Sequence, residues 1–359
     1  MTTRYGATRA DLAALFEAWG EPRYRANQLF DGLWTQRTPL DDITTLPKLL
    51  RARLTDALPL ALTEVVAQTA ADGATSKWLW RTHDSAQVET VLMLSDDRAT
   101  VCVSSQAGCA MGCTFCATGQ AGFERHLDAG EIVEQVVRAQ HRTEARVSHV
   151  VFMGMGEPLA NFDPVCDALD RLHDDLGLSA RHLTVSTVGV VPGMRRLAGF
   201  HLPVTLAVSL HAPDDALRAT LVPLNDRYPI AAVLDAAREY AAAKGRRVTF
   251  EYACIAGVND EPEQADRLAH RLAGLRAGAH VNLIPLNPTG EFKGLPPDRG
   301  RINRFAARLA AAGVTVTVRR NRGVDIDAAC GQLRARSAVL PAPHGPGRDR
   351  PARSARMVP

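Results

Sequence analysis

Alternation of apolar and amphipathic segments constrains the fold of this chain more than any other feature of its sequence. After residue 105, short apolar segments typical of β-strands alternate with segments of helical period. The predicted strands are His149–Met153, His182–Thr187, Val204–Leu210, Arg247–Tyr252, His280–Pro285 and Val314–Arg319. The predicted helices between them include Gly130–Arg142, Val165–Asp175, Ile230–Ala243, Glu263–Leu275 and Asp298–Ala312. Strands joined by helices run parallel, so the pattern predicts an α/β fold, an open or full βα barrel with its chemistry at the C-terminal strand ends.

The two ends of the chain have a different pattern. Residues 9–36 predict two helices, and short strands are expected at Leu62–Gln68, Lys77–Arg81, Gln87–Leu94 and Arg98–Ser104, with a hairpin turn at Asp72-Gly73. Residues 335–359 contain five prolines, five arginines and one aspartate, a composition typical of disorder. We therefore expect an N-terminal accessory domain over residues 1–94, a barrel core over 95–334 and a disordered basic tail over 335–359.

Composition excludes several classes of protein. The 46% apolar and 23% charged residues are ordinary globular values, so general disorder is excluded. No run of about 18 uninterrupted apolar residues predicts a membrane span, and the N-terminus carries no basic-then-apolar signal. A cytoplasmic, membrane-free protein is expected. Its net charge of +3 is too small to prove a nucleic-acid partner.

Three of the seven cysteines lie close together, at Cys109, Cys113 and Cys116, in the spacing C-x3-C-x2-C. An odd number of cysteines argues against a disulfide framework and favours thiol or metal chemistry in a reducing compartment. Structural zinc sites need four ligands, usually from two cysteine hooks, and no second hook follows. Three thiolates suit a [4Fe–4S] cluster with one iron left for an exogenous ligand. A zinc clip completed by a distant His or Cys is the alternative.

The triad, with Phe115 before its last cysteine, resembles the radical S-adenosylmethionine (SAM) superfamily. Further segments resemble the RNA adenine methyltransferases of the RlmN/Cfr type, over roughly residues 20 to 335; they are Val88–Val91, Val101–Gln106, Met153–Pro158, Ser209–Ala212, Leu283–Pro288 and Arg322–Leu333. The resemblance implies a partial (βα)6-type radical SAM barrel with a small N-terminal helical and β-rich accessory domain for RNA. In that superfamily the free iron binds the amino and carboxylate groups of SAM, and an electron from the cluster releases a 5′-deoxyadenosyl radical.

The same resemblance implies a set of SAM contacts at successive strand ends. They are Gly156, Glu157, Ser186, Ser209, Leu210, His211 and Asn287. A glycine permits close backbone approach, and a carboxylate complements the ammonium group of SAM. Without the triad upstream, Gly156-Glu157 would fit an ordinary tight turn before Pro158 equally well.

Two further cysteines carry the distinctive chemistry that the resemblance implies. Carbon 2 of adenine is electron-poor and cannot attack a SAM methyl group, so the family first places the methyl on a cysteine thiolate. Cys330 matches this methyl carrier, and Cys102 matches a second thiol that forms a transient disulfide with Cys330 and expels the methylated base. Glu89 matches a proton acceptor, although its sequence context alone is that of a solvated strand residue. Cys166 and Cys254 are expected to be packing residues.

The implied function is methylation of carbon 2 of an adenosine in 23S rRNA and of an adenosine in tRNA, with two SAM per turnover. The expected partners are 23S rRNA, tRNA and an electron donor such as flavodoxin or ferredoxin, and the expected state is a monomer. Three alternatives stay open: methylation of carbon 8 by the sister activity, a non-catalytic zinc-stabilised RNA-binding module, and an activase of a glycyl-radical enzyme. The last leaves Cys330 and Cys102 unexplained.

Several arginines are candidate phosphate contacts, although a solvated face explains them equally; they are Arg23, Arg25, Arg319, Arg320 and Arg322.

Overall fold

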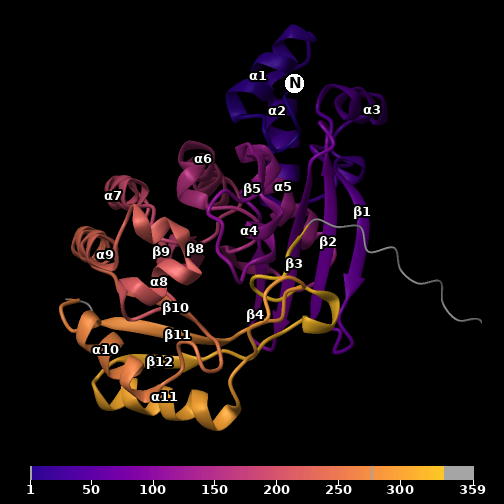
Figure 1. The fold of residues 1–359 in the computed structure, drawn as a ribbon. Helices are drawn as coiled ribbons and strands as arrows, with labels where there is room; N and C mark the ends of the chain where they lie inside the picture. Colours follow the sequence, from indigo (N-terminus) through magenta and orange to yellow (C-terminus); the bar gives the residue numbers. More distant parts are fainter. Residues whose placement is uncertain (1, 276–277, 335–359) are drawn as a thin grey trace, which may run out of the picture.

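One ten-stranded sheet runs through the part of the chain that the computed structural model describes, residues 2–275 and 278–334 (Figure 1). The strand order is β1-β2-β3-β4-β7-β8-β9-β10-β11-β12. The bounds are β1 Leu62–Thr69, β2 Thr75–Thr82, β3 Gln87–Ser95, β4 Arg98–Cys102, β7 Val147–Phe152, β8 Leu183–Thr187, β9 Thr205–Ser209, β10 Val248–Cys254, β11 Ala279–Pro285 and β12 Thr315–Val318. The first four strands pair antiparallel, and every pair from β4 to β12 is parallel. The predicted α/β class with a largely parallel sheet is confirmed.

Amphipathic helices cover the outer side of the curved parallel sheet (Figure 1). Their bounds are α5 Ala129–Gln140, α6 Phe162–Asp170, α7 Val191–Gly199, α9 Ile230–Lys244, α10 Pro262–Leu272 and α11 Arg299–Ala311. The start of α5 shows why these segments are helical: Asp128 and Glu131 form a reciprocal capping box at its N-terminus. Apolar residues at helical spacing, such as Ile132 and Val136, are then buried against the sheet.

Several short elements escape sequence prediction. They are β5 Gln106–Gly108, α4 Ala117–Ala121, β6 Phe123–His126, α7 and α8 Asp215–Leu221. Strands and helices of this length carry too few residues to show a period, and tertiary contacts hold them instead. The first N–H of α4, at Ala117, donates to the carbonyl of Gly331, 2.7 Å away. The 3-10 turns are Leu40–Asp42, Pro158–Ala160, Ala180–His182, Pro223–Asp226 and Val324–Ile326, and the π-helical turns are Asp31–Thr35 and Arg171–Asp175.

The N-terminal region is helical and then joins the sheet. Helices α1 Arg9–Ala18, α2 Arg23–Phe30 and α3 Lys48–Ala57 precede β1. The predicted hairpin turn lies between β1 and β2, where the Gly73 N–H donates to the Ala70 carbonyl. Strands β1 to β3 extend the core sheet through β4, so the predicted boundary at residue 94 falls near the end of β3 and stays a prediction.

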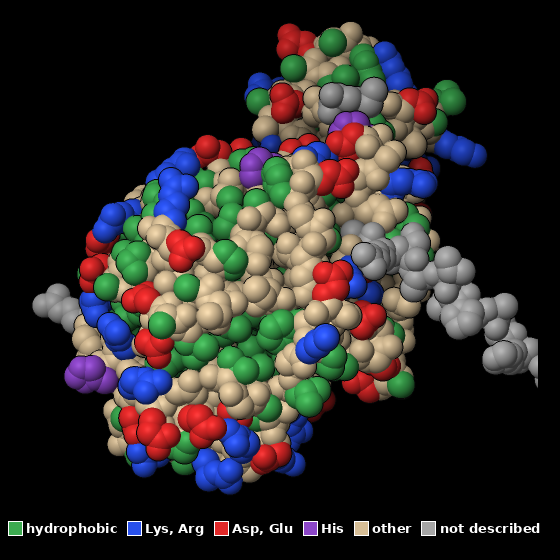
Figure 2. Space-filling view, viewed as in Figure 1, with side chains coloured by type: hydrophobic (Ala, Val, Ile, Leu, Met, Phe, Trp, Pro, Cys, Tyr) green, Lys and Arg blue, Asp and Glu red, His purple; other side chains and the backbone are tan. Residues whose placement is uncertain are grey.

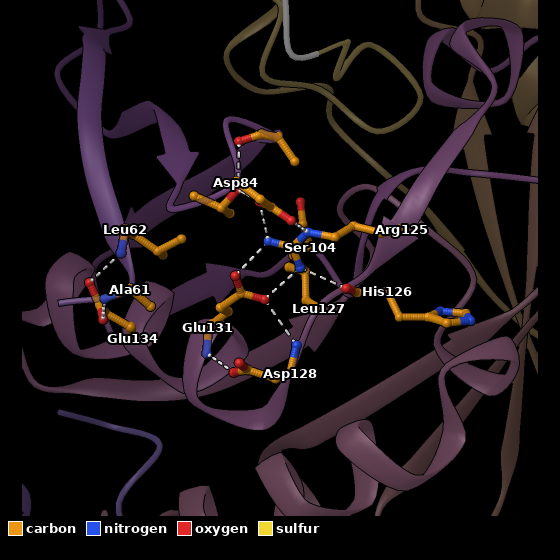
Figure 3. Close-up of polar contacts among 12 residues, drawn as sticks. Ala61, Leu62, Asp84, Ser104, Arg125, His126, Leu127, Asp128, Glu131 and Glu134 are labelled. Atoms are coloured by element: carbon orange, nitrogen blue, oxygen red, sulfur yellow. Dashed lines mark hydrogen bonds and ion pairs between the residues drawn. The ribbon is translucent and has the colours of Figure 1, made fainter. Parts of the chain in front are cut away.

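Buried carboxylates tie α5 to the elements on either side of it (Figure 3). Glu134 accepts from the N–H groups of Ala61 and Leu62, at 2.8 and 3.1 Å, at the start of β1. Glu131 accepts two hydrogen bonds from the guanidinium of Arg125, at 2.8 and 2.7 Å, and Arg125 lies on β6. Helix α5 thereby fixes the accessory strands and the β6 region relative to each other.

The chain beyond β12 crosses the open side of the parallel sheet and returns to β1–β3 (Figure 1). The Asp325 carboxylate accepts from the Ala71 N–H at 2.9 Å, and the Glu89 carboxylate accepts from the Arg334 N–H at 2.8 Å.

The predicted disordered tail, residues 335–359, lies outside the described residues. No helix in the described ranges has the length and apolar character needed to cross a membrane.

Candidate active site

A small antiparallel ribbon, β5 and β6, holds the two ends of the cysteine loop together. Gln106 pairs with His126, and the Cys109 N–H donates to the Gly122 carbonyl at 2.7 Å. Gly108 has a φ of +73°, and a Cβ atom there would lie 2.0 Å from the Gly122 carbonyl oxygen. Only glycine permits this close approach, so the loop over 109–122 leaves the ribbon at one fixed geometry.

The three cysteine thiols of the triad line one cavity of about 170 Å³. Burial raises the pKa of Cys109 to about 12 and raises the pKa of Cys113 well above its ordinary value, and the neighbouring thiols add to both shifts. Desolvation favours the neutral thiol, so thiolates at this place need a positive centre beside them. The irons of a cluster would supply that charge, and the donor set therefore fits the group.

A single metal ion fits the same residues less well. Across residues 2–275 and 278–334, no group of three or more His, Cys, Asp or Glu side chains is arranged to hold one ion. Zinc draws its ligands to about 2.0–2.3 Å from a single point. A [4Fe–4S] cluster instead binds each thiolate through a different iron, so thiols that share a cavity can hold it without meeting at a single metal ion.

Strand ends supply the opposite wall of the cavity. Gly156, Glu157, Ser186, Ser209 and His211 all line it, at the carboxyl ends of β7, β8 and β9. The viewed face of the molecule is hollowed near its middle, where hydrophobic side chains gather within a rim of charged ones (Figure 2). Polar groups from successive strands thus meet around one largely apolar hollow, as ligand sites in βα folds require.

Glu157 is held by backbone groups from two directions. Its carboxylate accepts from the Val188 N–H at 2.8 Å and from the Leu159 N–H at 3.0 Å, while its own N–H donates to the Gln106 side chain at 2.7 Å. Burial nevertheless raises the pKa of Glu157 to about 7. A carboxylate that desolvation penalises in this way gains from a ligand ammonium placed beside it.

Asn287 connects the cavity to Cys330. Its side-chain Nδ2 donates to the Cys330 carbonyl at 3.0 Å, and its Oδ1 is buried without a hydrogen-bond partner among the residues that the structure describes. An unpaired buried acceptor costs free energy, so Oδ1 fits a donor from a bound ligand. Leu210, in contrast, does not line the cavity: it is fully buried in the core, and its N–H donates to the Glu251 carbonyl.

Cys330 and Cys102 approach the cavity from different elements. Cys330 lines the cavity and is exposed at its mouth, whereas Cys102 is buried at the end of β4. Desolvation raises the pKa of both thiols; the charge of Cys330 raises that of Cys102 further, and Arg319 opposes the rise at Cys330. The effect of Cys330 on Cys102 indicates that the two thiols are within range of each other's charge. All seven cysteines are free thiols in the structure.

Glu89 lies outside this cavity. It is only 3% exposed and forms an ion pair with Lys77, whose Nζ is 3.0 Å from Glu89 Oε1. Its interpretation as a solvated strand residue is therefore wrong. Glu89 lines a second cavity, of about 270 Å³, which the segment carrying Cys330 also borders.

Sequence analysis missed several residues that line the thiol cavity. Phe115 contacts His211 edge to face, with 4.8 Å between the ring centroids, and Glu251 is a buried carboxylate that accepts from Asn282 at 2.9 Å. Arg319, considered only as a candidate phosphate contact, lines the cavity just beyond β12. Glu251 and Arg319 both lie near the carboxyl ends of predicted strands. The expectation that a βα fold carries its chemistry at the carboxyl ends of its strands could have found them.

Comparison with known proteins places these features in context. The family model described as the radical SAM superfamily matches residues 103–269. A protein of Parafrankia sp. (strain EAN1pec) named "Probable dual-specificity RNA methyltransferase RlmN" is 54% identical over 355 residues, covering 92% of this chain and 91% of the relative. A protein of the same name from Chloroflexus aurantiacus is 48% identical, covering 93% of each chain. The crystal structure of a radical SAM methyltransferase from Sphaerobacter thermophilus superposes with a TM-score of 0.90 at 50% identity, covering 94% of this chain and 100% of the other.

Proposed function

Because the chain belongs to the RlmN-type radical SAM RNA methyltransferases, we propose that it methylates carbon 2 of an adenosine in 23S rRNA, at the peptidyl-transferase centre, and of an adenosine in tRNA. The dual specificity named for its relatives supports the two substrates. The observation that carries the proposal is that Cys330 and the cysteine triad line one cavity, with the buried Cys102 close enough to Cys330 for the charge of Cys330 to act on it.

In this proposal Cys109, Cys113 and Cys116 hold a [4Fe–4S] cluster, and the strand ends bind SAM. When bound, these groups supply an electron, a methyl group and a means of removing a hydrogen atom, with two SAM used per turnover. Glu157 faces the ammonium of SAM, and Asn287 Oδ1 accepts from a donor on it. Ser186, Ser209 and His211 line the remaining wall, with Gly156 at the turn.

The two cysteines outside the triad divide the covalent work. Cys330 acts as the thiolate nucleophile that accepts the methyl, and Arg319 favours this thiolate by its positive charge. Once the carbon forms a bridge between the Cys330 sulfur and adenine, the ring loses its proton; the Cys102 thiolate then attacks the Cys330 sulfur, and the bond between that sulfur and the carbon breaks with its electron pair going to the carbon, which takes up a proton to become the methyl group. The resulting disulfide frees the methylated base. Glu89 is the proton acceptor that the family resemblance implies.

RNA, a small electron-transfer protein such as flavodoxin or ferredoxin, and a monomeric state complete the proposal. Adenine in folded RNA must be splayed out to reach the cavity. Family membership favours the enzyme over a zinc-stabilised binding module. Metal analysis of anaerobically purified protein should find iron and sulfide; one zinc per chain without iron would contradict the cluster.

The proposal is tested by mass spectrometry of 23S rRNA and tRNA from a strain that lacks the gene and from the complemented strain. Deletion should remove 2-methyladenosine from both RNAs, and complementation should restore it. Loss of 8-methyladenosine instead would assign the sister activity. In the purified enzyme, the peptide with Cys330 should gain about 14 Da, the mass of a CH2 unit added when a thiolate is methylated.

Removal of Cys102 gives a sharper test of the order of events. Cys102→Ala should still accept the methyl on Cys330 and then stall while covalently joined to RNA, in a complex that survives denaturant and yields to nuclease. Cys254→Ala is the matched control, because Cys254 is a buried thiol on β10 that does not line the cavity. Multiple turnover by Cys102→Ala without trapped RNA would show that another group resolves the intermediate.

A further inference from the structure

The second cavity, of about 270 Å³, lies between β1–β3 and the segment that carries Cys330. It is lined largely by polar side chains, among them Gln68, Lys77, Glu89, Asp325 and Gln332. Two of these, Lys77 and Glu89, form an ion pair whose side chains are only 9% and 4% exposed. A buried ion pair of this kind adds little net stability, because desolvation offsets most of the attraction. Its hydrogen bonds to the backbone of the Cys330 segment indicate a role in holding that segment.

The pair reaches the Cys330 segment on both sides of the cysteine. Lys77 Nζ, 3.0 Å from Glu89 Oε1, also donates to the Asp327 carbonyl at 3.3 Å. The other oxygen of Glu89, Oε2, accepts from the Arg334 N–H at 2.8 Å. A continuous polar chain therefore runs from residue 327 through Lys77 and Glu89 to residue 334, and closes the loop that contains Cys330.

This loop needs external support to keep its shape. Asp327 has a φ of +52°, a left-handed conformation that aspartate adopts more readily than most residues but that still costs more than it would for glycine. No regular helix or strand spans residues 327–334, so backbone hydrogen bonds of secondary structure do not hold it. A strained conformation persists only when surrounding contacts impose it.

Contacts from the thiol cavity hold the middle of the same loop. The Ala117 N–H donates to the Gly331 carbonyl at 2.7 Å, and Asn287 donates to the Cys330 carbonyl at 3.0 Å. The middle of the loop is thus attached to the start of α4, next to Cys116, and to the segment just after β11, while its two ends are attached to β2 and β3 by the ion pair. Two side chains hold the loop as well: Thr118 Oγ1 donates to the Leu333 carbonyl at 2.7 Å, and Gln332 Nε2 donates to the Pro288 carbonyl at 3.0 Å. The ion pair adds the attachments at residues 327 and 334.

We propose that Lys77 and Glu89 form an ionic clasp that closes the loop over residues 327–334 and positions Cys330 at the thiol cavity. Lys77 is a positioning residue: it touches neither the thiols nor the strand ends, and acts through the loop. The inference rests on the proposed function in so far as the positioned thiol is the methyl carrier. It assigns to the accessory strands β2 and β3 a part in the reaction.

The test removes the cation and keeps its length. In Lys77→Met the flexible apolar side chain fills the same space but leaves the Asp327 carbonyl without its donor and Glu89 without the Lys77 ammonium. The matched control is Lys48→Met, because Lys48 is exposed at the start of α3. The double variant Lys77→Met/Glu89→Leu removes both members of the ion pair, so any loss of stability that comes from keeping the buried Glu89 carboxylate without the Lys77 ammonium is relieved while the clasp is still absent.

Hydrogen–deuterium exchange of the cluster-loaded full chain measures loop opening directly. Peptides covering residues 323–334 should exchange at least about tenfold faster in Lys77→Met and in the double variant, the change expected when a hydrogen bond to a charged group is lost. Peptides from α9 should exchange as in the wild type. Exchange at the wild-type rate in Lys77→Met overturns the clasp, and so does fast exchange in Lys77→Met that the double variant restores to normal.

A second readout separates positioning from general damage. The rate at which Cys330 gains its methyl in protein reconstituted with the cluster should fall about tenfold in Lys77→Met, because misplacing a nucleophile lowers the rate of its reaction. The Kd for SAM should stay at the wild-type value. An unchanged methylation rate refutes the positioning role. Absence of the methyl from wild-type Cys330 would refute the proposed function instead, and leave the exchange result standing.

Discussion

The turn after β7 allows a quantitative test of how the cavity is built. Gly156 has a φ of +105°, and a Cβ atom there would lie 2.6 Å from Gln106 Cβ and 2.8 Å from the Gln106 backbone nitrogen. Neither neighbour can give way freely, because Gln106 pairs with β6 and its side chain accepts from the Glu157 N–H at 2.7 Å. Gly156→Ala should therefore push the cysteine ribbon away from the turn that carries Glu157.

Three contributions set the magnitude of this effect. A positive φ costs a residue other than glycine about 1–2 kcal/mol. Overpacking a filled site costs about 1–3 kcal/mol, and breaking the buried hydrogen bond to Gln106 costs about 1–3 kcal/mol. Gly177→Ala is the matched control, since Gly177 has a φ of +68° but no neighbouring atom within 4 Å of the added Cβ. The control carries only the first cost, so the free energies of unfolding of the two variants should differ by about 2–6 kcal/mol.

Urea unfolding of both variants measures that difference in the free energy of unfolding. Calorimetric titration with SAM then measures the functional consequence. SAM should bind at least about tenfold more weakly to Gly156→Ala, which corresponds to about 1.4 kcal/mol of the total. Gly177→Ala should bind SAM as the wild type does. Equal unfolding midpoints for the two variants, with wild-type SAM affinity in both, would show that Gln106 yields easily and that the turn is not fixed as the structure implies.

Three further predictions concern the core and the triad. Burial raises the pKa of Glu134 to about 7, so the folded state holds the proton more tightly than the unfolded state. Wild-type stability should fall as pH rises from about 5 to about 8, by about 2.5 kcal/mol more than in Glu134→Gln, and parallel urea curves for the two proteins would contradict this. Thr90→Val should cost about 1–3 kcal/mol of unfolding free energy, because Thr90 joins Trp80 Nε1 to Gln135 at 2.9 and 2.8 Å; the exposed Thr69→Val should cost almost nothing. Alanine at Cys109, Cys113 or Cys116 should abolish both the iron content and SAM cleavage, whereas Cys166→Ala should retain them, and full iron content in any of the three would refute the cluster assignment.

Local sequence patterns predicted the main secondary structure and the cysteine site of this protein. The period of apolar residues placed the major helices and parallel strands, because burial of one face imposes that period whatever the rest of the chain does. The close spacing of Cys109, Cys113 and Cys116 likewise predicted a shared site, since residues within one short loop cannot separate far. The family resemblance implied SAM contacts at Ser186, Ser209 and His211, and the structure brings all three to the same cavity.

Only the tertiary structure decided what depends on contacts between distant segments. Leu210 follows β9 at a predicted site position, yet the packing of the core turns it away from the cavity. Glu89 alternates with buried neighbours on β3 as a solvated residue would, but the returning segment after β12 covers it and brings Arg334 to its carboxylate. That segment has no period of its own, and its course is fixed by hydrogen bonds to groups far away along the chain, including Lys77, Asn287 and Ala117. Such contacts leave no local trace in the sequence, because each partner lies in an unremarkable context until the folded sheet brings the two together.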